Sequence, residues 1–164
     1  MTKARVPEQQ PVGAEAGPPK GPLALRERYS RCFGCGQNNP MGLKLRLHED
    51  EGKAKGEFVP QPHHQGWPPY VHGGILGTLL DEAMAYVPVF LGLFTITARM
   101  EIRFVKPAPI AGKLTVEAQA TRVTRKLVEA NGTAYDEDGN IVATGNATML
   151  VLSESQAQRL GLTG

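Results

Sequence analysis

The segment at residues 70–87 reads YVHGGILGTLLDEAMAYV and combines an apolar helical pattern with two adjacent acids, Asp81 and Glu82. We predict a helix that begins at the glycine pair and ends near Pro88, because proline cannot continue a helix interior. A carboxylate is rarely buried without a partner or a function, since removing its charge from water is costly. The acids of this helix are therefore the first candidates for chemistry.

Small residues share the helix face of Asp81. Residues three, four and seven positions away lie on one face, and on the N-terminal side these are Gly74, Gly77 and Thr78. We predict a shallow trough here, in which a ligand or another backbone can approach Asp81 closely. The alternative is that the glycines only let the helix pack on a sheet and that Asp81 pairs with a nearby arginine.

The HGG motif at residues 72–74 opens the same helix. Backbone N–H groups at a helix N-terminus lack intrahelical partners, and the helix dipole favours negative charge there. Without a Cβ, Gly73 would let a carbonyl oxygen approach its amide, which makes it a candidate oxyanion donor for acyl chemistry. A glycine-rich helix start without a catalytic role is the alternative interpretation.

Composition predicts one ordinary domain. The chain has 164 residues, 41% of them hydrophobic, with 18 basic and 16 acidic side chains. This balance is not typical of a nucleic-acid-binding protein, which usually has a basic stripe. The longest apolar run, residues 83–94, contains a proline and is too short to cross a bilayer. No leader pattern is recognisable, so we predict a cytoplasmic protein with no membrane or nucleic-acid partner.

The pattern along the chain predicts an α+β fold. Residues 42–60 contain two alternating segments around an Asp-Glu-Gly turn, as in a β-hairpin. Alternation after Gly92 predicts another strand, and further strands are expected at residues 113–125, 127–137 and 141–152. We therefore expect a curved antiparallel sheet with one buried helix. Residues 1–25 are rich in proline and glycine, which predicts a disordered N-terminal tail.

Four motifs together resemble hotdog-fold acyl-CoA thioesterases, in the phenylacetyl-CoA and 4-hydroxybenzoyl-CoA thioesterase superfamily. They are HGGILGTLLDEAMA, CFGCGQNNPMGLKL, RFVKPAPIAGKL and DEDGNIVATGNATML. The resemblance covers about residues 30–152, and the combined order is more specific than any single motif. It implies a hotdog thioesterase domain at residues 26–155, a curved antiparallel sheet wrapped around one central helix, and a C-terminal tail at residues 156–164.

The resemblance implies hydrolysis of an acyl-CoA thioester to a free acid and CoA, without a metal or an organic cofactor. Gly73 would polarise the thioester carbonyl, His72 would support this carbonyl site, and Gly74 would contact the substrate. Asp81 would be the general base or the nucleophile, and Thr97 would help to hold the attacking water. Simple alternation places Thr97 on the charged face of its strand, so this role requires a bulge or the start of the strand.

Further substrate contacts are expected outside the helix. Many relatives have an asparagine six residues before the motif histidine, where this chain has Gly66, and Gln65 would substitute for it. Basic side chains suit the phosphates of CoA, although they more often form a solvated face. The candidates are Arg103, Lys106, Arg125 and Lys126.

The spacing of Gly73 and Asp81 has a consequence for assembly. They are eight residues apart, so a helix separates them by about 12 Å. One thioester carbon cannot contact both at bonding distance. We therefore predict active sites built from two subunits of a homo-oligomer, and the resemblance likewise implies a dimer or a dimer of dimers.

Two other functions stay open. One is a non-catalytic, acyl-CoA-binding hotdog protein. The other is a hotdog dehydratase or hydratase, but in dehydratases the acid follows the helix-opening glycine by five positions, whereas Glu82 lies eight beyond Gly74. The hydratase pattern has a histidine five residues after the aspartate, where this chain has Tyr86.

A zinc site is the remaining hypothesis from the sequence. Cys32 and Cys35 form a C-x-x-C pair, which supplies half of a structural site. His63 and His64 are adjacent, outside the usual ligand spacing. We therefore predict no metal site, and a tight turn that carries two reduced thiols.

Overall fold

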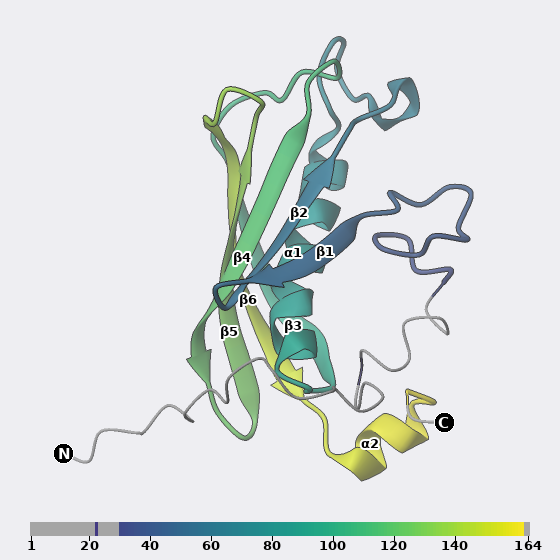
Figure 1. The fold of residues 1–164 in the computed structure, drawn as a ribbon, viewed down its shortest axis with the longest axis vertical. Helices are drawn as coiled ribbons and strands as arrows, with labels where there is room; N and C mark the ends of the chain where they lie inside the picture. Colours follow the sequence, from purple (N-terminus) through teal and green to yellow (C-terminus); the bar gives the residue numbers. More distant parts are fainter. Residues whose placement is uncertain (1–21, 23–29, 163–164) are drawn as a thin grey trace, which may run out of the picture.

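The computed structural model describes residue 22 and residues 30–162. Its elements pack as one sheet and one long helix (Figure 1). In chain order they are β1 (Arg46–Asp50), β2 (Lys53–Phe58), η2 (Pro62–His64), α1 (Gly73–Phe90), β3 (Thr95–Phe104), β4 (Leu114–Val123), β5 (Leu127–Tyr135), β6 (Ile141–Val151) and α2 (Glu154–Arg159).

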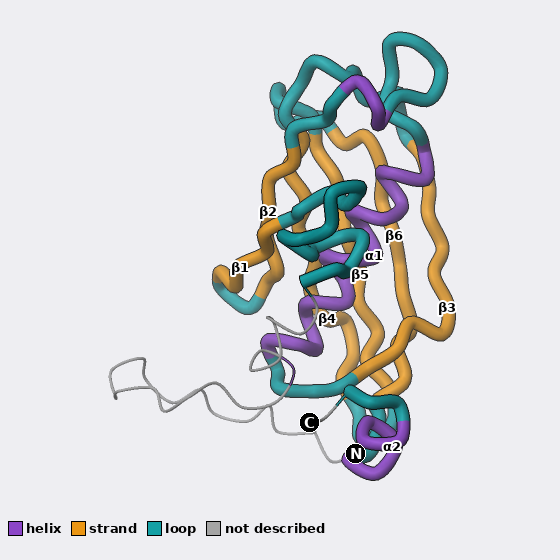
Figure 2. The backbone as a smooth tube through the Cα atoms, turned by 90° about the vertical axis from the view of Figure 1, so that its right-hand side faces the viewer, coloured by secondary structure: helices purple, strands orange, loops and turns teal. Residues whose placement is uncertain are grey.

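The six strands form one antiparallel sheet in the order β1-β2-β4-β5-β6-β3. The helix α1 runs along one face of this sheet (Figure 2). Strand β3 follows α1 in the chain but pairs with β6, so it lies at one edge of the sheet, and β1 lies at the other. The α+β prediction of a curved antiparallel sheet around one central helix is confirmed.

The core lies between α1 and the central strands. Leu79, Leu80 and Met84 of the helix are fully buried. Gly132 of β5 is paired with Gly145 of β6, and a Cβ on either would lie 3.1–3.2 Å from the Met84 side chain. The two glycines therefore let the helix approach the sheet closely, where each buried aliphatic side chain contributes about 1.5–3 kcal/mol.

The predicted hairpin is formed by β1 and β2. Its two turn residues, Glu51 and Gly52, have φ values of 51° and 78°. Asp50 pairs with Lys53 across this two-residue turn. Positive φ at both central positions is the geometry that matches the right-handed twist of the flanking strands.

The C-terminus of α1 differs from the prediction. The helix was expected to end near Pro88 but continues to Phe90. It ends where Gly92 adopts a φ of 76°, because Gly92 N–H then donates to Val89 O at 3.0 Å and Leu93 N–H to Pro88 O at 2.9 Å. This pair of bonds satisfies the last carbonyls of the helix. A proline within the final turn removes only one helical hydrogen bond, so the glycine sets the end.

The chain ends differ in what the structure describes. The N-terminal tail predicted at residues 1–25 lies outside the described residues, apart from Pro22. The C-terminal segment predicted from residue 156 begins inside α2, which has Ser153 as its N-cap and buries Ala157. Among the described residues, no helix combines the length and the hydropathy that a membrane span requires.

Candidate active site

The HGG motif is the N-terminus of α1. His72 is the N-cap, and its Nδ1 accepts a hydrogen bond from Gly74 N–H at 2.9 Å. Within the described part of the chain, no hydrogen bond from Gly73 N–H is recorded. The first turn of a helix leaves such groups unsatisfied, and they carry the positive end of the dipole. His72 therefore orients the turn, and Gly73 N–H is a donor that a carbonyl oxygen can use.

Asp81 lies two turns further along α1 and is hydrogen-bonded to β3. Thr97 Oγ1 donates to Asp81 Oδ1 at 3.1 Å. The carboxylate is half-buried. A hydroxyl beside a carboxylate can also hold a water molecule that the carboxylate deprotonates, which is the arrangement a general base needs.

A bulge in β3 brings Thr97 to Asp81. Thr97 is paired with Met149, but the next paired residue is Arg99, opposite Thr148, so Ala98 is the extra residue. Because Met149 is fully buried beneath the helix, its partner Thr97 faces the helix as well. The extra residue reverses the alternation, which explains how Thr97 avoids the charged face that simple alternation assigned to it.

A groove between α1 and β3 contains the carboxylate of Asp81. It has a volume of about 460 Å³. The trough that the sequence predicted beside Asp81 is therefore present, with glycines along its helical wall. Its lining residues are Gly73, Gly74, Gly77, Thr78, Asp81, Met100, Ile102 and Phe104.

Two of these glycines leave room that a larger residue would fill. A Cβ on Gly77 would lie 3.2 Å from Ile102 Cδ1, and one on Gly73 would lie 3.3 Å from the Phe104 ring. Phe104 thus lies over the helix start, and Ile102 lies over the second turn of the helix.

The other predicted substrate contacts are not among the residues that line the groove. Gln65 is exposed and forms a bridge with Val71 in the loop before the helix. Arg103 is exposed on β3. Lys106 forms an ion pair with Asp136 at 2.6 Å, in the turn between β5 and β6, and this lysine holds the Asp136 pKa down at about 2. Gly66, at the position where relatives have asparagine, packs against His72.

Within one chain, Gly73 and Asp81 are on the same continuous helix. Their separation of eight residues therefore corresponds to about 12 Å. The donor and the carboxylate of one chain cannot both contact the same substrate carbon.

A second cluster, which we call the Cys-Glu cluster, consists of Cys32, Cys35 and Glu82. Cys32 Sγ donates to Glu82 Oε1 at 3.1 Å, and the three ligand atoms all lie within 4.8 Å of one another. Burial, reinforced by Cys32, raises the Glu82 pKa to about 8. A hydrogen bond from Cys35 lowers the Cys32 pKa to about 4, and the same bond raises the Cys35 pKa.

Sequence reasoning did not join these three residues. The C-x-x-C pair was recognised, but its partner was sought in His63 and His64, which lie in η2 and are not part of the cluster. Glu82 is 50 residues from Cys32 in the chain. The sequence contains one signal for the cluster, a pair of adjacent acids within an apolar helix, but the thioesterase resemblance gives a role only to Asp81.

Comparisons with known proteins agree with this fold. Residues 69–143 match the model of the thioesterase superfamily. Acyl-coenzyme A thioesterase THEM5 of Mus musculus is 26% identical over 114 residues, which cover 68% of this chain and 46% of that protein. The chain spans about half the length of the curated relatives it matches.

Solved structures share the hotdog fold. The PaaI protein of E. coli, from the phenylacetic acid degradation operon, has a TM-score of 0.64 and 22% identity, over 68% of this chain and 81% of that chain. A hypothetical thioesterase of Streptococcus pneumoniae, solved with coenzyme A, has a TM-score of 0.63 and 21% identity, over 66% of this chain and 86% of that chain. Structures of two alanine variants of the pneumococcal protein exist, one at a threonine and one at an aspartate sixteen positions earlier.

Proposed function

Because this chain has the hotdog fold and its residues 69–143 match the thioesterase superfamily, we propose that it hydrolyses an acyl-CoA thioester to a free acid and CoA. The observation that carries the proposal is the hydrogen bond from Thr97 to Asp81 in the groove between α1 and β3. The two residues are sixteen positions apart, the same separation as the aspartate and threonine that were replaced in the pneumococcal protein.

The thioester carbonyl binds at the helix start. Gly73 N–H donates to the carbonyl oxygen, and this bond strengthens as the oxygen becomes negative in the tetrahedral intermediate. The helix dipole acts in the same direction. His72 is a positioning residue, because its Nδ1 holds Gly74 N–H and thereby the first turn.

Asp81 supplies the base or the nucleophile. As a base it accepts a proton from a water molecule held by Thr97, and the water oxygen bonds to the carbonyl carbon. As a nucleophile its carboxylate oxygen bonds to that carbon directly, and water later hydrolyses the anhydride. In both routes the carbon–sulfur bond breaks and CoA leaves as a thiolate, which takes up a proton.

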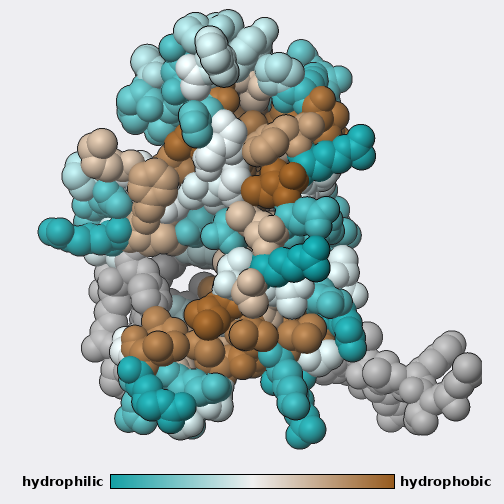
Figure 3. Space-filling model, turned by 180° about the vertical axis from the view of Figure 1, so that it is seen from behind, coloured by the Kyte–Doolittle hydropathy of each residue, from teal (hydrophilic) through white to brown (hydrophobic). Residues whose placement is uncertain are grey.

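A second copy of this chain completes each site. Gly73 and Asp81 of one chain are too far apart, so Gly73 of one subunit acts with Asp81 of the other. Strand β3 is an edge strand that exposes Ile96, Met100 and Phe104, by 44%, 38% and 55%. An exposed apolar edge strand favours pairing with another chain. Figure 3, seen from the side on which β3 lies, shows apolar patches on this face.

A panel of acyl-CoA esters tests the proposal. Aromatic, medium-chain and long-chain esters are incubated with the purified full chain, and released CoA is measured by chromatography. A thiol reagent is avoided because Cys32 and Cys35 would react with it as well. Release of CoA from at least one class, above the rate without protein, supports the proposal. Binding of esters with no release from any class would contradict hydrolysis and favour a non-catalytic acyl-CoA-binding protein.

A further inference from the structure

The Cys-Glu cluster lies on a different face of α1 from the groove, and the proposed hydrolysis does not use it. Cys32 and Cys35 belong to the loop before β1, whereas Glu82 belongs to α1. We propose that Cys32, Cys35 and Glu82 form a binding site for one zinc ion, with the two sulfur atoms and one carboxylate oxygen as ligands.

The ligand atoms are close to the spacing that zinc requires. Zinc bonds to sulfur at about 2.3 Å and to carboxylate oxygen at about 2.0–2.2 Å, so neighbouring ligands of a tetrahedral ion are about 3.4–3.8 Å apart. In the structure, Cys32 Sγ and Glu82 Oε1 are 3.1 Å apart and no pair in the cluster exceeds 4.8 Å. Changes of about 1 Å or less in these separations would place all three ligand atoms around one ion.

Backbone hydrogen bonds of the loop before β1 hold both sulfur atoms near Glu82. Gly36 N–H donates to Cys32 O at 3.0 Å and closes the turn, while Leu45 N–H donates to Gly34 O at 2.9 Å and ties the loop to the start of the sheet. A Cβ on Gly34 would overlap the Glu82 side chain. The glycine between the cysteines therefore lets the carboxylate reach them.

The charges at the cluster also favour a cation. A carboxylate and two thiols meet in a half-buried place. No ion pair of Glu82 with lysine, arginine or histidine is recorded in the described part of the chain. Arg46, which lines the same pocket as the cluster, donates from Nε to Gln37 at 3.2 Å instead. A divalent ion would supply the positive charge that this cluster lacks, and thiolates favour zinc over magnesium or calcium.

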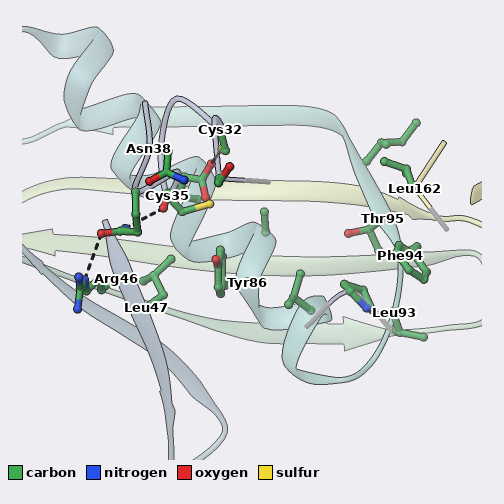
Figure 4. A pocket seen from close by; sticks show the side chains of 17 residues that line it. Cys32, Cys35, Asn38, Arg46, Leu47, Tyr86, Leu93, Phe94, Thr95 and Leu162 are labelled. Atoms are coloured by element: carbon green, nitrogen blue, oxygen red, sulfur yellow. Dashed lines mark hydrogen bonds between the residues drawn. The ribbon is translucent and has the colours of Figure 1, made fainter. Parts of the chain in front are cut away.

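The fourth ligand position faces a pocket. All three cluster residues line a cavity of about 960 Å³, which continues to Phe94, Thr95 and Leu162. Cys32 and Cys35 lie at one end of this pocket (Figure 4). Three protein ligands with an open position that water can take are typical of zinc sites that bind a further ligand, whereas structural sites have four protein ligands.

Cobalt and zinc titrations of the full chain test the site. The protein is reduced, freed of metal with a chelator and handled without oxygen, so that the thiols stay reduced. We expect Co²⁺ to produce a thiolate-to-cobalt charge-transfer band and the strong visible absorption of tetrahedral cobalt, at one ion per chain. Either ion should release protons when it binds to the metal-free protein and should raise the melting temperature, and Zn²⁺ should then displace bound Co²⁺.

Variants distinguish the three ligands from nearby groups. Glu82→Gln keeps the side-chain shape and should weaken cobalt binding at least tenfold, and Cys32→Ser or Cys35→Ser should remove the charge-transfer intensity of one thiolate. Asp81→Asn is the matched control, because it changes the adjacent carboxylate outside the cluster, and His63→Ala controls for binding at exposed histidine. Both controls should titrate like the wild type.

Two outcomes would overturn the site. One is a reduced wild-type protein that shows no charge-transfer band. The other is a folded Glu82→Gln variant with wild-type affinity and spectrum. Metal-free melting curves establish folding for each variant, and Glu82→Gln keeps the test decisive if a cysteine variant does not fold. Metal stoichiometry is measured without substrate, so failure of this site and failure of the proposed hydrolysis are separate results.

Discussion

Asp81 and Glu82 are neighbours in the chain but belong to two different environments. One residue along a helix corresponds to a rotation of about 100°, so the two carboxylates point to different faces of α1. Asp81 faces a groove of about 460 Å³, lined by glycines and by strand β3. Glu82 faces a pocket of about 960 Å³ and contacts the cysteine loop.

Burial by itself would select a different acid from the one that we propose as catalytic. Glu82 has the raised pKa of about 8, chiefly because it is buried. Asp81, the acid that we propose as catalytic, lies in an accessible groove and accepts a hydrogen bond from Thr97. Cys32 and Cys35 lie outside residues 69–143, the range that matches the superfamily, whereas Thr97 and both acids lie within it.

The largest expected effect separates the two acids. Asp81→Asn keeps the side-chain shape but removes the base, so kcat should fall by about two orders of magnitude or more. Glu82→Gln should change kcat much less, because Glu82 does not face the groove. Steady-state rates of both variants on the same acyl-CoA ester check this. If Glu82→Gln is inactive and Asp81→Asn has the wild-type rate, the catalytic acid is Glu82 and the active site lies on the other face of α1.

Mixed dimers test whether each active site needs Asp81 from one subunit and Gly73 from the other. Asp81→Asn and Gly73→Ala should each be inactive, the second because its Cβ would lie 3.3 Å from Phe104 and narrow the approach to the amide. A mixed dimer has one site with both defects and one site with none. Statistical co-refolding of equal amounts should therefore restore roughly a quarter of the wild-type activity.

The control for this experiment is subunit exchange, which is measured with differently tagged chains. Melting curves of the two single variants confirm that both are folded. Demonstrated exchange without any recovered activity would mean that each site lies within one chain.

Thr97→Val tests the bond that distinguishes the Asp81 face. Valine keeps the β-branched shape and removes the hydroxyl, so kcat should fall about tenfold, which corresponds to about 1.4 kcal/mol, near the lower end of the range for a hydrogen bond to a charged group. Thr95→Val is the matched control, because Thr95 is on the same strand but lines the pocket on the Glu82 side. Equal losses in the two variants would point to a general effect on β3 and not to the bond with Asp81.

Gly34→Ala addresses the Glu82 face and has the smallest expected effect on catalysis. The new Cβ would displace Glu82 from the two sulfur atoms. Overpacking of this kind costs about 1–3 kcal/mol, which should lower the melting temperature by several degrees. Gly112→Ala is the control, since its Cβ would make an ordinary contact of 3.5 Å. A kcat that falls with Gly34→Ala, measured well below the melting temperature, would show that the two faces are coupled.

Local patterns were sufficient to predict much of the molecule. The helix from Gly73, the hairpin turn at Glu51 and Gly52, and the succession of elements along the chain were predicted because apolar periodicity and glycine positions reflect short-range backbone geometry. The trough beside Asp81 followed from the same periodicity, since residues three, four and seven apart share a helix face. Pro88 predicts an end about two residues before the observed one, because the proline rule applies to a helix interior and Pro88 lies in the final turn, which Gly92 terminates.

Contacts between distant segments were decided by the tertiary structure. The extra residue Ala98 reverses the alternation of β3 and turns Thr97 toward Asp81, and whether a strand contains such a bulge depends on the strand it pairs with. Lys106 pairs with Asp136 because the β5–β6 turn lies beside it. Cys32 meets Glu82 across 50 residues because the loop before β1 folds back onto α1. Such contacts depend on sheet register and on the path of a loop, and short-range sequence patterns do not specify either of them.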